Sequence, residues 1–434
     1  MGIFADLSFA LYTGFFILSI HINALPTHSL ANPEPWTLYV AQQSTGILTL
    51  AFDPSKSVSS SLEIINVNTQ AGFMPGWVTT HEDKLYSIAR THYPTTHSTS
   101  GGVFSFQRNR LQGHNTTGNY SLQSINSVSS KGTSSVACDV SKDGKTIGVA
   151  NIDGSTVSIH PLSEVGVIGE ASYVFKYNLS HPGPGTNGSQ IQSNPHEAIF
   201  EPSGQYMFVT DRGADRLYVY RVAGPFDVLQ IDTIVLPPGT GPRHLTFRTY
   251  NSSRTYMYLV SELDNTVRVF TLDGLDNISK RKEKSMSPKL TITLRQTAST
   301  LGPGSNRTAP DNKHLASEVA ISADGKFVYA SNRNTVSYDS DTLTIFSVHP
   351  DLYNDEGHLV YLGSNLTYGK IPRHFSLSKD MENKYIAVAN EVSQSVMVLE
   401  RDAKSGFISK LRGNITLGGL DITQSLGPAA VIFN

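Results

Sequence analysis

Four short motifs in this sequence combine imidazole, guanidinium and carboxylate groups. They are Pro195-His196, Pro242-Arg243-His244, Ser317-Glu318 and Pro372-Arg373-His374. A second set consists of charged residues that stand alone, Arg90, Arg212, Glu262, Arg333 and Glu391. Histidine transfers protons near neutral pH, and arginine binds carboxylates through paired hydrogen bonds. Brought together, these groups would suit acid–base chemistry on an anionic small molecule.

These residues recur because the sequence around them repeats. Segment 195–222 (PHEAIFEPSGQYMFVTDRGADRLYVYRV) has the same plan as segments 135–162, 243–271, 317–348 and 373–400. Each copy has an alternating apolar strand, a turn such as Ser-Lys-Asp-Gly, and a second apolar strand. A polar break, a third strand and a weaker fourth strand follow. Two degenerate copies occupy residues 76–106 and 37–52.

The first copy lacks its first strand. Residues 37–52 supply only a second and a third strand, whereas residues 427–433 (GPAAVIF) resemble a first strand with nothing after it. Pairing the two ends would close a ring and remove an exposed sheet edge, whereas a solenoid would not explain the split repeat. The sequence therefore predicts an all-β, seven-bladed β-propeller of four-stranded antiparallel blades. The C-terminal strand completes blade one, and each blade takes about fifty to sixty residues.

The propeller geometry predicts where the chemistry lies. In an antiparallel pair, the start of the first strand and the end of the second strand lie at the same end. Both sets of charged residues should therefore ring one mouth of the central channel. We expect the long loops 180–194 and 297–314 to form walls around that mouth. The opposite face carries Asp-Gly and Ser-Gly turns, which have a structural explanation.

Several of these motifs resemble the seven-bladed β-propeller lactonase family. They are Pro195-His196, Gly241-Pro242-Arg243-His244, residues 211–216 (DRGADR), Ser331-Asn332-Arg333 and Asn390-Glu391. The family includes bacterial propeller-type 6-phosphogluconolactonases and fungal 3-carboxy-cis,cis-muconate cyclases. The resemblance covers residues 36–434 and is strongest over residues 135–400.

The resemblance also implies which residues form the site. The catalytic residues it implies are His196, Arg243, Glu262 and Arg333. The other charged residues of the predicted mouth are candidates for substrate binding, namely His244, Arg212, Glu318, Arg373, His374 and Glu391. The sequence departs from the family at one point, because Ser261-Glu262 stands where an Asn-Glu pair is usual. This departure bears on how the substrate is oriented there.

The same residues suit two directions of lactone chemistry. To form a lactone, a carboxylate adds across a double bond while a proton reaches the neighbouring carbon. The arginines would hold the carboxylates, His196 would carry the proton, and Glu262 would orient His196 or act as its partner. To open a lactone, His196 or Glu262 would activate water while the arginines stabilise the oxyanion.

Three functions follow from this chemistry. We expect a lactonising isomerase similar to the muconate cyclases, acting on a small-molecule carboxylate or lactone. One alternative is a sugar-lactone hydrolase of the 6-phosphogluconolactonase type. The other is a non-catalytic secreted glycoprotein that binds ligands or partners.

Composition excludes several other classes. A formal net charge of -2 gives no electrostatic reason for binding nucleic acid or an anionic membrane. The single cysteine, Cys138, cannot form an intrachain disulfide, and its apolar surroundings predict a buried, inert thiol. The three mouth histidines are not part of a ligand-pair motif such as H-E-x-x-H, so we expect no metal and no cofactor.

The N-terminus predicts export. Residues 7–20 (LSFALYTGFFILSI) form an apolar run of signal-peptide length that is too short for a membrane span. We expect a signal peptide at residues 1–31, cleaved after Ala24 or Ala31, and a single propeller domain at residues 32–434, secreted and free of the membrane. The segment before the run contains Asp6 and no Lys or Arg, so a buried helix or an uncleaved anchor is the alternative.

N-linked glycans are expected on the secreted protein. The sequence contains nine acceptor motifs, at Asn115, Asn119, Asn178, Asn187, Asn251, Asn277, Asn306, Asn365 and Asn414.

Overall fold

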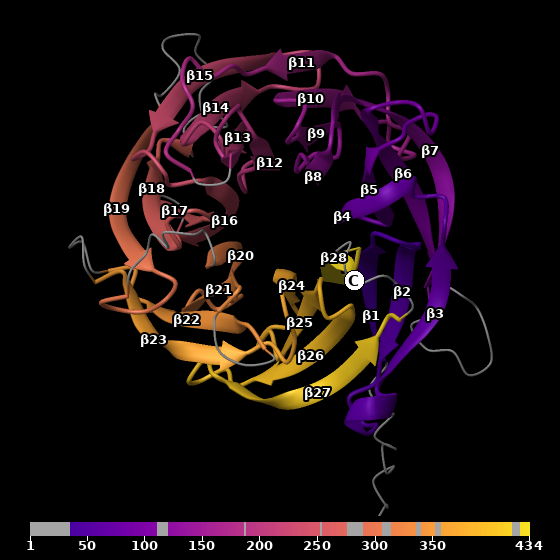
Figure 1. Cartoon of the computed structure of the whole chain (residues 1–434), viewed down its shortest axis with the longest axis vertical. Helices are drawn as coiled ribbons and strands as arrows, with labels where there is room; N and C mark the ends of the chain where they lie inside the picture. Colours follow the sequence, from indigo (N-terminus) through magenta and orange to yellow (C-terminus); the bar gives the residue numbers. More distant parts are fainter. Residues whose placement is uncertain are drawn as a thin grey trace, which may run out of the picture. The chain divides into compact units, whose positions relative to one another are not determined.

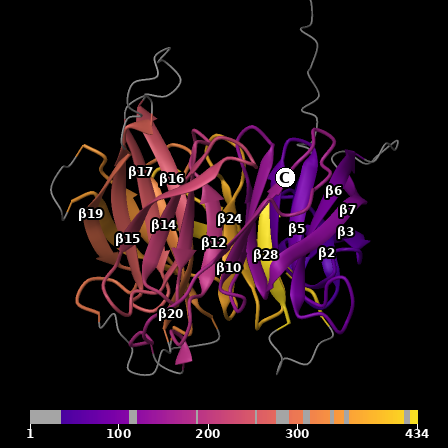
Figure 2. The ribbon, with the colours of Figure 1, turned by 90° about the horizontal axis from the view of Figure 1, so that it is seen from above.

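The repeats form four-stranded antiparallel blades arranged in a ring. In the computed structural model, seven such sheets surround a central channel (Figure 1). The structure describes residues 35–110, 120–185, 188–251, 254–275, 290–305, 314–335, 340–351, 357–418 and 426–434. Figure 2 shows the ring edge-on, with its strands running between the two faces. The predicted seven-bladed propeller is confirmed.

The blades follow one another along the chain, and only blade one combines both ends of it. The strands of blades one to three, from the innermost outward, are β28 (Pro428–Phe433), β1 (Trp36–Gln42), β2 (Gly46–Phe52) and β3 (Leu62–Asn68); β4 (Phe73–His81), β5 (Lys84–Thr91), β6 (Ser100–Arg110) and β7 (Tyr120–Thr133); β8 (Ser135–Val140), β9 (Thr146–Asn151), β10 (Thr156–Pro161) and β11 (Tyr173–Lys176). Blades four and five consist of β12 (Pro195–Phe200), β13 (Tyr206–Asp211), β14 (Arg216–Val222) and β15 (Val228–Val235); β16 (Pro242–Asn251), β17 (Arg254–Ser261), β18 (Thr266–Asp273) and β19 (Thr291–Ser299). Blades six and seven consist of β20 (Leu315–Ile321), β21 (Phe327–Arg333), β22 (Thr342–Val348) and β23 (Leu359–Leu366); β24 (Pro372–Leu377), β25 (Tyr385–Asn390), β26 (Ser395–Arg401) and β27 (Ile408–Thr416).

The hydrophobic core lies between neighbouring blades. The second strand of a blade is covered on both faces, so every residue of β9 and of β25 is buried. The outer strand β15 is mostly exposed, because it has a neighbour on one face only. Each core cluster joins two blades, as where Val260 of β17 and Val328 of β21 share one cluster. Packing of blade against blade thus fixes the ring that positions the mouth residues.

The C-terminal strand closes the ring, as predicted. In register, β28 pairs with β1 through Leu38 opposite Phe433 and Val40 opposite Val431. Figure 1 shows β28, in yellow, beside the indigo β1. Phe433 is 1% exposed and packs edge-on against Trp36, with ring centroids 5.8 Å apart. The two ends of the described domain are therefore held in one sheet.

Every inner strand carries a β-bulge at the start of its pairing with the second strand. In blades one, two and three the extra residue is Ala429, Gly76 or Val136. In blades four, five and seven it is His196, Arg243 or Arg373, and the bulge of blade six contains Ser317 and Glu318. A bulge takes its extra residue out of the strand's alternation and redirects the side chain. Chemically active bulge residues therefore occupy blades four to seven, whereas small or apolar ones occupy the other three.

Several sequence predictions concern features that bear less on the site. The expected signal peptide, residues 1–31, lies outside the described residues. Of the nine glycan acceptors, Asn178 and Asn414 are exposed and Asn365 is half-buried. Asn251 is the last residue of β16, and the other five lie outside the described residues. Cys138 is buried, and burial raises the pKa of its thiol. The part of the chain that the structure describes contains no helix with the length and hydrophobicity of a membrane span.

Candidate active site

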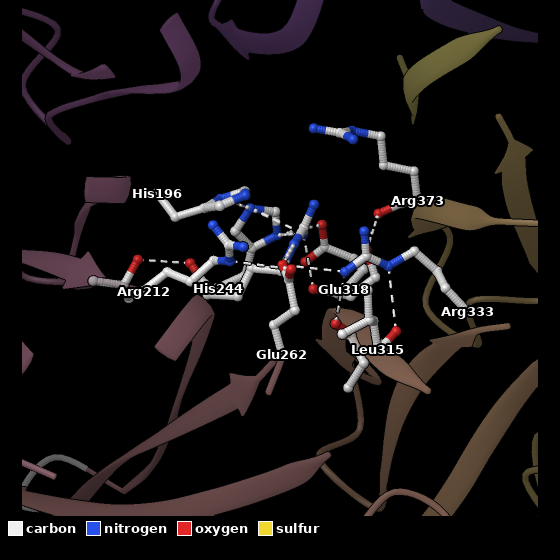
Figure 3. A network of polar contacts seen from close by, with 12 residues as sticks. His196, Arg212, His244, Glu262, Leu315, Glu318, Arg333 and Arg373 are labelled. Atoms are coloured by element: carbon white, nitrogen blue, oxygen red, sulfur yellow. Dashed lines mark hydrogen bonds and ion pairs between the residues drawn. The ribbon is translucent and has the colours of Figure 1, made fainter. Parts of the chain in front are cut away.

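The structure places the charged residues of the sequence motifs around one end of the channel. His196, Arg243, His244, Glu318, Arg373 and His374 lie on the first residues of inner strands, and Arg212, Glu262, Arg333 and Glu391 lie where second strands end. Figure 3 labels eight residues of this network, which converge from blades four to seven; seven of them come from the motifs. All ten candidates thus lie at one mouth, some at the start of an inner strand and the others at the end of a second strand.

Main-chain hydrogen bonds hold the residues that follow the second strands. The N–H of Arg212 donates to the carbonyl of Asn194, and the N–H of Glu262 donates to the carbonyl of Gly241. In both blades the accepting carbonyl immediately precedes the inner strand. In each of these two blades, the residue after the second strand is thereby fixed to the start of the inner strand.

Glu262 lies among three arginines. Its Oε1 is 3.1 Å from Nε of Arg212, and its Oε2 is 3.1 Å from both Nε of Arg243 and Nη2 of Arg333. Burial opposes ionisation of this carboxyl, but the charges of Arg212, Arg333 and Arg243 outweigh it and hold the pKa of Glu262 well below its usual range. Glu262 therefore stays ionised, and its carboxylate holds the three guanidinium groups together.

Arg243 is enclosed, with 1% of its surface exposed. Its Nη1 donates to the carbonyl of Ser317 at 2.8 Å and lies 2.9 Å from Nδ1 of His244. Its own carbonyl accepts a hydrogen bond of 2.6 Å from Thr210 of the preceding blade. Burial and the nearby Arg333 lower the pKa of Arg243 to about 9. These contacts give Arg243 the role of positioning Glu262 and His244.

A chain of hydrogen bonds links Glu318, His244 and His196. Nδ1 of His244 is 2.8 Å from Oε2 of Glu318, and Nε2 of His244 is 3.1 Å from Nδ1 of His196. Burial and Arg243 hold the pKa of both histidines well below 6.5, so both rings are neutral. With Glu318 ionised, the protons lie on Nδ1 of each ring, and Nε2 of His196 keeps a free lone pair.

This chain changes the role expected for Glu262. The sequence predicted that Glu262 would orient His196 or act as its partner, but in the structure His244 contacts His196, with Glu318 behind it. Burial raises the pKa of Glu318, and His374 and Arg243 counteract the rise. Glu318 Oε1 also accepts the N–H of Val319 at 3.0 Å, which helps to keep the carboxylate in place.

His374 and Trp77 complete the floor of the site. Nδ1 of His374 accepts the N–H of Val431 at 3.3 Å, so its proton lies on Nε2, which is 3.5 Å from Oε2 of Glu318. Burial lowers the pKa of His374 to about 4, and Glu318 partly opposes this. The Trp77 ring, from blade two, makes edge-on contacts with the rings of His244 and His374, at centroid distances of 5.2 and 4.9 Å. Trp77 therefore reaches across the channel.

Arg373 and Glu391 form a second ion pair at the mouth. Nη1 of Arg373 is 3.4 Å from Oε2 of Glu391, and Oε1 of Glu391 accepts a hydrogen bond of 2.7 Å from Gln43. Burial opposes ionisation of Glu391, but Arg373 and the neighbouring Arg90 lower its pKa below the usual value. The carbonyl of Arg373 accepts a hydrogen bond from Ser317, so the bulges of blades six and seven are tied together.

A pocket of about 590 Å³ opens beside this network. Its lining consists of Asp153, Gly188, Ser189, Ile191, Gln192, Asn194, Arg212, Glu262, Leu263 and Leu315. Half of these residues belong to the long loop before β12, which forms a wall of the mouth as expected. The volume is in the range of small-molecule sites, and Arg212 and Glu262 connect it to the charged network.

The DRGADR motif builds this wall through Asp211 and Gly213 and directs one member, Arg212, to the pocket. Oδ1 of Asp211 accepts the N–H groups of Asn194, Gly213 and Ala214 at 2.8 to 3.1 Å. A Cβ atom at Gly213 would lie 1.9 Å from the carbonyl oxygen of Gln192, so only glycine fits there. Arg212 is the member of the motif that faces the pocket.

The departure at Ser261 has a structural answer. In blades three, six and seven the corresponding asparagines donate Nδ2 to a carbonyl of the preceding blade, at the end of its outer strand or just after it, at 3.0 to 3.1 Å. In blade five, Ser261 instead accepts a hydrogen bond of 2.9 Å from Arg268, whose Nη2 pairs with Asp264 at 2.5 Å. The asparagine therefore has a structural role, because it ties its blade to the preceding one. Its replacement by Ser261 leaves Glu262 in place.

The channel contains a second cavity, of about 220 Å³, on the other side of Trp77 and His374. It is lined by residues further along the inner strands, among them Asp139 and Glu197. Asp139 accepts the N–H of Phe200 at 3.0 Å, and Glu197 accepts the N–H of Leu245 at 2.7 Å. These buried acids join neighbouring blades. Within the described ranges, no three His, Cys, Asp or Glu side chains are arranged as metal ligands.

Sequence reasoning missed Trp77 and Gly76. Both follow Pro75 in blade two, at the positions that His244 and Arg243 occupy after Pro242. Because blade two is a degenerate copy with an apolar residue and a glycine at these positions, nothing in their chemistry marked them. Aligning the prolines that begin the inner strands would have identified them.

Comparison with known proteins agrees with this geometry. Residues 36–420 match the family model described as "Lactonase, 7-bladed beta-propeller". The chain is similar to a 6-phosphogluconolactonase of Formosa agariphila, with 24% identity over 384 residues, covering 88% of this chain and 95% of that protein. It is also 25% identical to the 6-phosphogluconolactonase of Bacillus subtilis, over 87% of this chain and 94% of the relative. Among solved structures, the periplasmic gluconolactonase PpgL of Pseudomonas aeruginosa superposes with a TM-score of 0.72 at 24% identity, covering 92% of this chain and 99% of that one.

Proposed function

Because this chain belongs to the lactonase family of seven-bladed β-propellers, we propose that it is an enzyme that opens a lactone ring by hydrolysis. The relatives named 6-phosphogluconolactonase favour this reaction over the cyclase expected from sequence. The observation that carries the proposal is the chain from Glu318 through His244 to His196. It ends at His196, whose Nδ1 lies 3.1 Å from Nε2 of His244 and whose Nε2 is the ring nitrogen at the free end of the chain.

His196 is the general base of the proposed reaction. Its Nε2 makes no hydrogen bond with the described residues, so a water molecule or a substrate can take that position. As the imidazole accepts a proton, the positive charge that forms is balanced through His244 by the carboxylate of Glu318. Arg243 disfavours that charge, so the imidazolium returns its proton readily.

The reaction proceeds through a tetrahedral intermediate. Water loses a proton to Nε2 of His196 while its oxygen attacks the lactone carbonyl carbon. Arg212 and Arg333, whose side chains are 18% and 10% exposed, stabilise the oxyanion. The intermediate collapses by breaking the bond between the carbonyl carbon and the ring oxygen. The ring oxygen takes the proton back from His196, which gives a hydroxy acid.

The electrostatics of the mouth favour an anionic substrate. Five arginines, Arg90, Arg212, Arg243, Arg333 and Arg373, face three glutamates, Glu262, Glu318 and Glu391, while the histidines are neutral. These eight charged side chains therefore carry a formal excess of two positive charges, which Asp153 in the pocket lining reduces to one. A sugar lactone with a phosphate or carboxylate group would compensate this excess, as would the carboxylate of the product.

The test is a hydrolysis assay on purified protein at pH 6.5, with glucono-δ-lactone and 6-phosphogluconolactone. We expect a rate above spontaneous hydrolysis and a loss of at least about 100-fold in His196→Ala, because the general base is removed. His349→Ala, at an exposed histidine outside the site, is the control and should keep full activity. A wild-type rate equal to the spontaneous rate, or an active His196→Ala variant, would overturn the proposal.

Lactone formation remains the second candidate. The excess of arginines favours it, because an unsaturated polyacid needs several cations to hold its carboxylates. Consumption of 3-carboxy-cis,cis-muconate by the wild type, lost in His196→Ala, would support this direction. Binding of acids without turnover in either assay would instead support a non-catalytic binding protein.

We further propose that the mature protein is secreted and carries N-linked glycans. The apolar run at residues 7–20 and the nine acceptor motifs support this. N-terminal sequencing of protein from the culture medium should begin at residue 25 or 32. Retention of residues 1–24 would contradict cleavage, and an unchanged mass after glycosidase treatment would contradict glycosylation.

A further inference from the structure

In each blade, one residue directly follows the second-strand residue that pairs with the inner-strand residue just before the bulge. From blade one to blade seven these residues are Gln43, Arg90, Ile152, Arg212, Glu262, Arg333 and Glu391. Glu262 forms ion pairs with both Arg212 and Arg333, and Gln43 donates a hydrogen bond to Glu391. Arg90 is the charged member of this set for which the described residues offer no ion pair.

The Arg90 side chain has an unusual hydrogen-bonding state. Its Nε and Nη2 atoms are shielded from solvent and have no partner among the described residues. A buried donor without an acceptor is unfavourable, and more so when the group is charged. The nearby carboxylate of Glu391 is already bound by Arg373 and Gln43. Burial and the charge of Arg373 lower the pKa of Arg90 to about 10, so the guanidinium is still charged at neutral pH.

Gly76 provides the space that Arg90 occupies. Gly76 is the bulge residue of blade two, where blades four, five and seven have His196, Arg243 and Arg373. A Cβ atom at Gly76 would lie 3.4 Å from Nε of Arg90 and 3.0 Å from Cδ1 of Ile88. In blade two the guanidinium therefore comes from the second strand and lies beside an inner strand that has no side chain at this point.

We propose that Arg90, with Arg373 beside it, binds an anionic group of the substrate at the end remote from the reacting carbonyl. This inference rests on the proposed lactonase function and assigns residues to the recognition of the substrate's terminal carboxylate or phosphate. Blade two faces blades five and six across the ring, with β5 and β17 on opposite sides in Figure 1. A substrate whose carbonyl lies at Arg212 and Arg333 would therefore direct its far end toward Arg90.

The test measures binding rather than turnover, so that it is separate from the hydrolysis assay. Isothermal titration would compare three open-chain acids: gluconate, glucarate with a second carboxylate at C6, and 6-phosphogluconate with a phosphate at C6. In the wild type we expect glucarate or 6-phosphogluconate to bind more tightly than gluconate, and the preferred one identifies the terminal group. Arg90→Gln should weaken that ligand by about 10- to 100-fold, as for the loss of a charge-assisted hydrogen bond. Gluconate should lose much less.

Two further variants separate recognition from folding. Arg90→Lys keeps the charge and should recover part of the affinity, whereas Gly76→Ala keeps Arg90 but displaces it and should weaken the same ligand. Arg221→Gln removes a surface arginine paired with Asp227 and is the matched control, expected to bind all three acids as the wild type does. Thermal unfolding of each variant identifies any loss that comes from misfolding.

The outcomes distinguish this inference from the proposed function. Equal affinity of wild type and Arg90→Gln for all three acids, or an equal loss for all three, overturns the inference while hydrolysis by the wild type still supports the lactonase. A wild type that binds none of the acids and hydrolyses neither lactone overturns both.

Discussion

Nε of Arg243 lies 3.1 Å from Oε2 of Glu262, in a part of the channel where neither side chain is more than 8% exposed. The same carboxylate also holds Arg212 and Arg333. The three guanidinium groups approach one another because Glu262 neutralises part of their charge. The geometry of the anion-binding mouth therefore depends on this single acid.

Glu262→Gln should destabilise the fold as well as the site. The amide keeps the shape of the side chain but leaves three arginines without their counter-charge, and breaking a buried ion pair from one side costs about 3–5 kcal/mol. Urea unfolding at pH 7 measures the change. The control is Asp227→Asn, which removes an exposed partner of Arg221 and should change stability by less than about 1 kcal/mol. A Glu262→Gln variant as stable as the control would contradict this account.

The acid limb of the activity profile should respond to Arg243. His196 is neutral because burial and the charge of Arg243 lower its pKa, so wild-type kcat/KM should stay level as pH falls from 7 to below 6. In Arg243→Gln the protonated imidazole loses a repulsive neighbour and its pKa rises. The acid limb then moves to higher pH. A pH series of kcat/KM measures this shift, with Arg221→Gln as the variant that should show none. An unmoved limb in Arg243→Gln would mean that another group titrates.

Asp139→Asn should stabilise the protein above pH 6. Burial raises the pKa of Asp139 from 3.8 to about 6 in the folded state, so between these values the folded protein binds more protons than the unfolded chain. Its stability therefore falls as pH rises through this window. Asparagine avoids that loss. We expect a gain of about 1 kcal/mol, below the ~3 kcal/mol that the change in pKa would allow for a fully buried group, because Asp139 is half-buried and lines the cavity.

Chemical unfolding at pH 4 and pH 7.5 would reveal this effect as an advantage of the variant at the higher pH only. Asp324→Asn is the control of opposite sign. Although burial opposes ionisation of Asp324, its hydrogen bond with Ser322 holds the pKa below the usual value, so this substitution should destabilise at pH 7.5. An Asp139→Asn advantage equal at both pH values would exclude ionisation as its cause.

Phe433→Ala should weaken the closure of the ring. The side chain is 1% exposed and packs against Trp36 from the other end of the domain. Removing such a ring from a packed core costs about 3–5 kcal/mol. Thermal and urea unfolding would detect this, whereas Phe226→Ala, at a side chain that is 72% exposed, should stay within about 0.5 kcal/mol of the wild type. Comparable effects of the two substitutions would mean that β28 adds little to the ring.

The fold was predictable because each copy of the repeat shows where its strands and turns lie. The turn between the first and second strands recurs in each copy, and the unmatched segments at residues 37–52 and 427–433 could only be reconciled by joining them. The membership of the mouth was predictable for a similar reason, since strand ends such as Pro195-His196 and Arg333 recur at fixed places in the repeat.

The contacts within the mouth were not predictable in the same way. The link between His244 and His196 joins different blades, and its length depends on the channel radius and on the direction in which each bulge turns its side chain. The sequence therefore suggested Glu262 as the residue that orients His196 or acts as its partner, whereas the structure places His244, with Glu318 behind it, against His196. Trp77 was missed because a tryptophan in an apolar strand is ordinarily a core residue, and only the curvature of the ring brings it to His374.

The pairing of β28 with β1 also has a consequence for synthesis. Strand β1 is synthesised before the other strands of the propeller, but its inner neighbour β28 is synthesised after all of them. Until Pro428–Phe433 is complete, the newly made chain has an open sheet edge that can pair with another molecule. A ribosome that stalls between β27 and β28 would therefore hold a chain with an unprotected edge. The arrival of β28 thus marks the point in synthesis at which the ring can close.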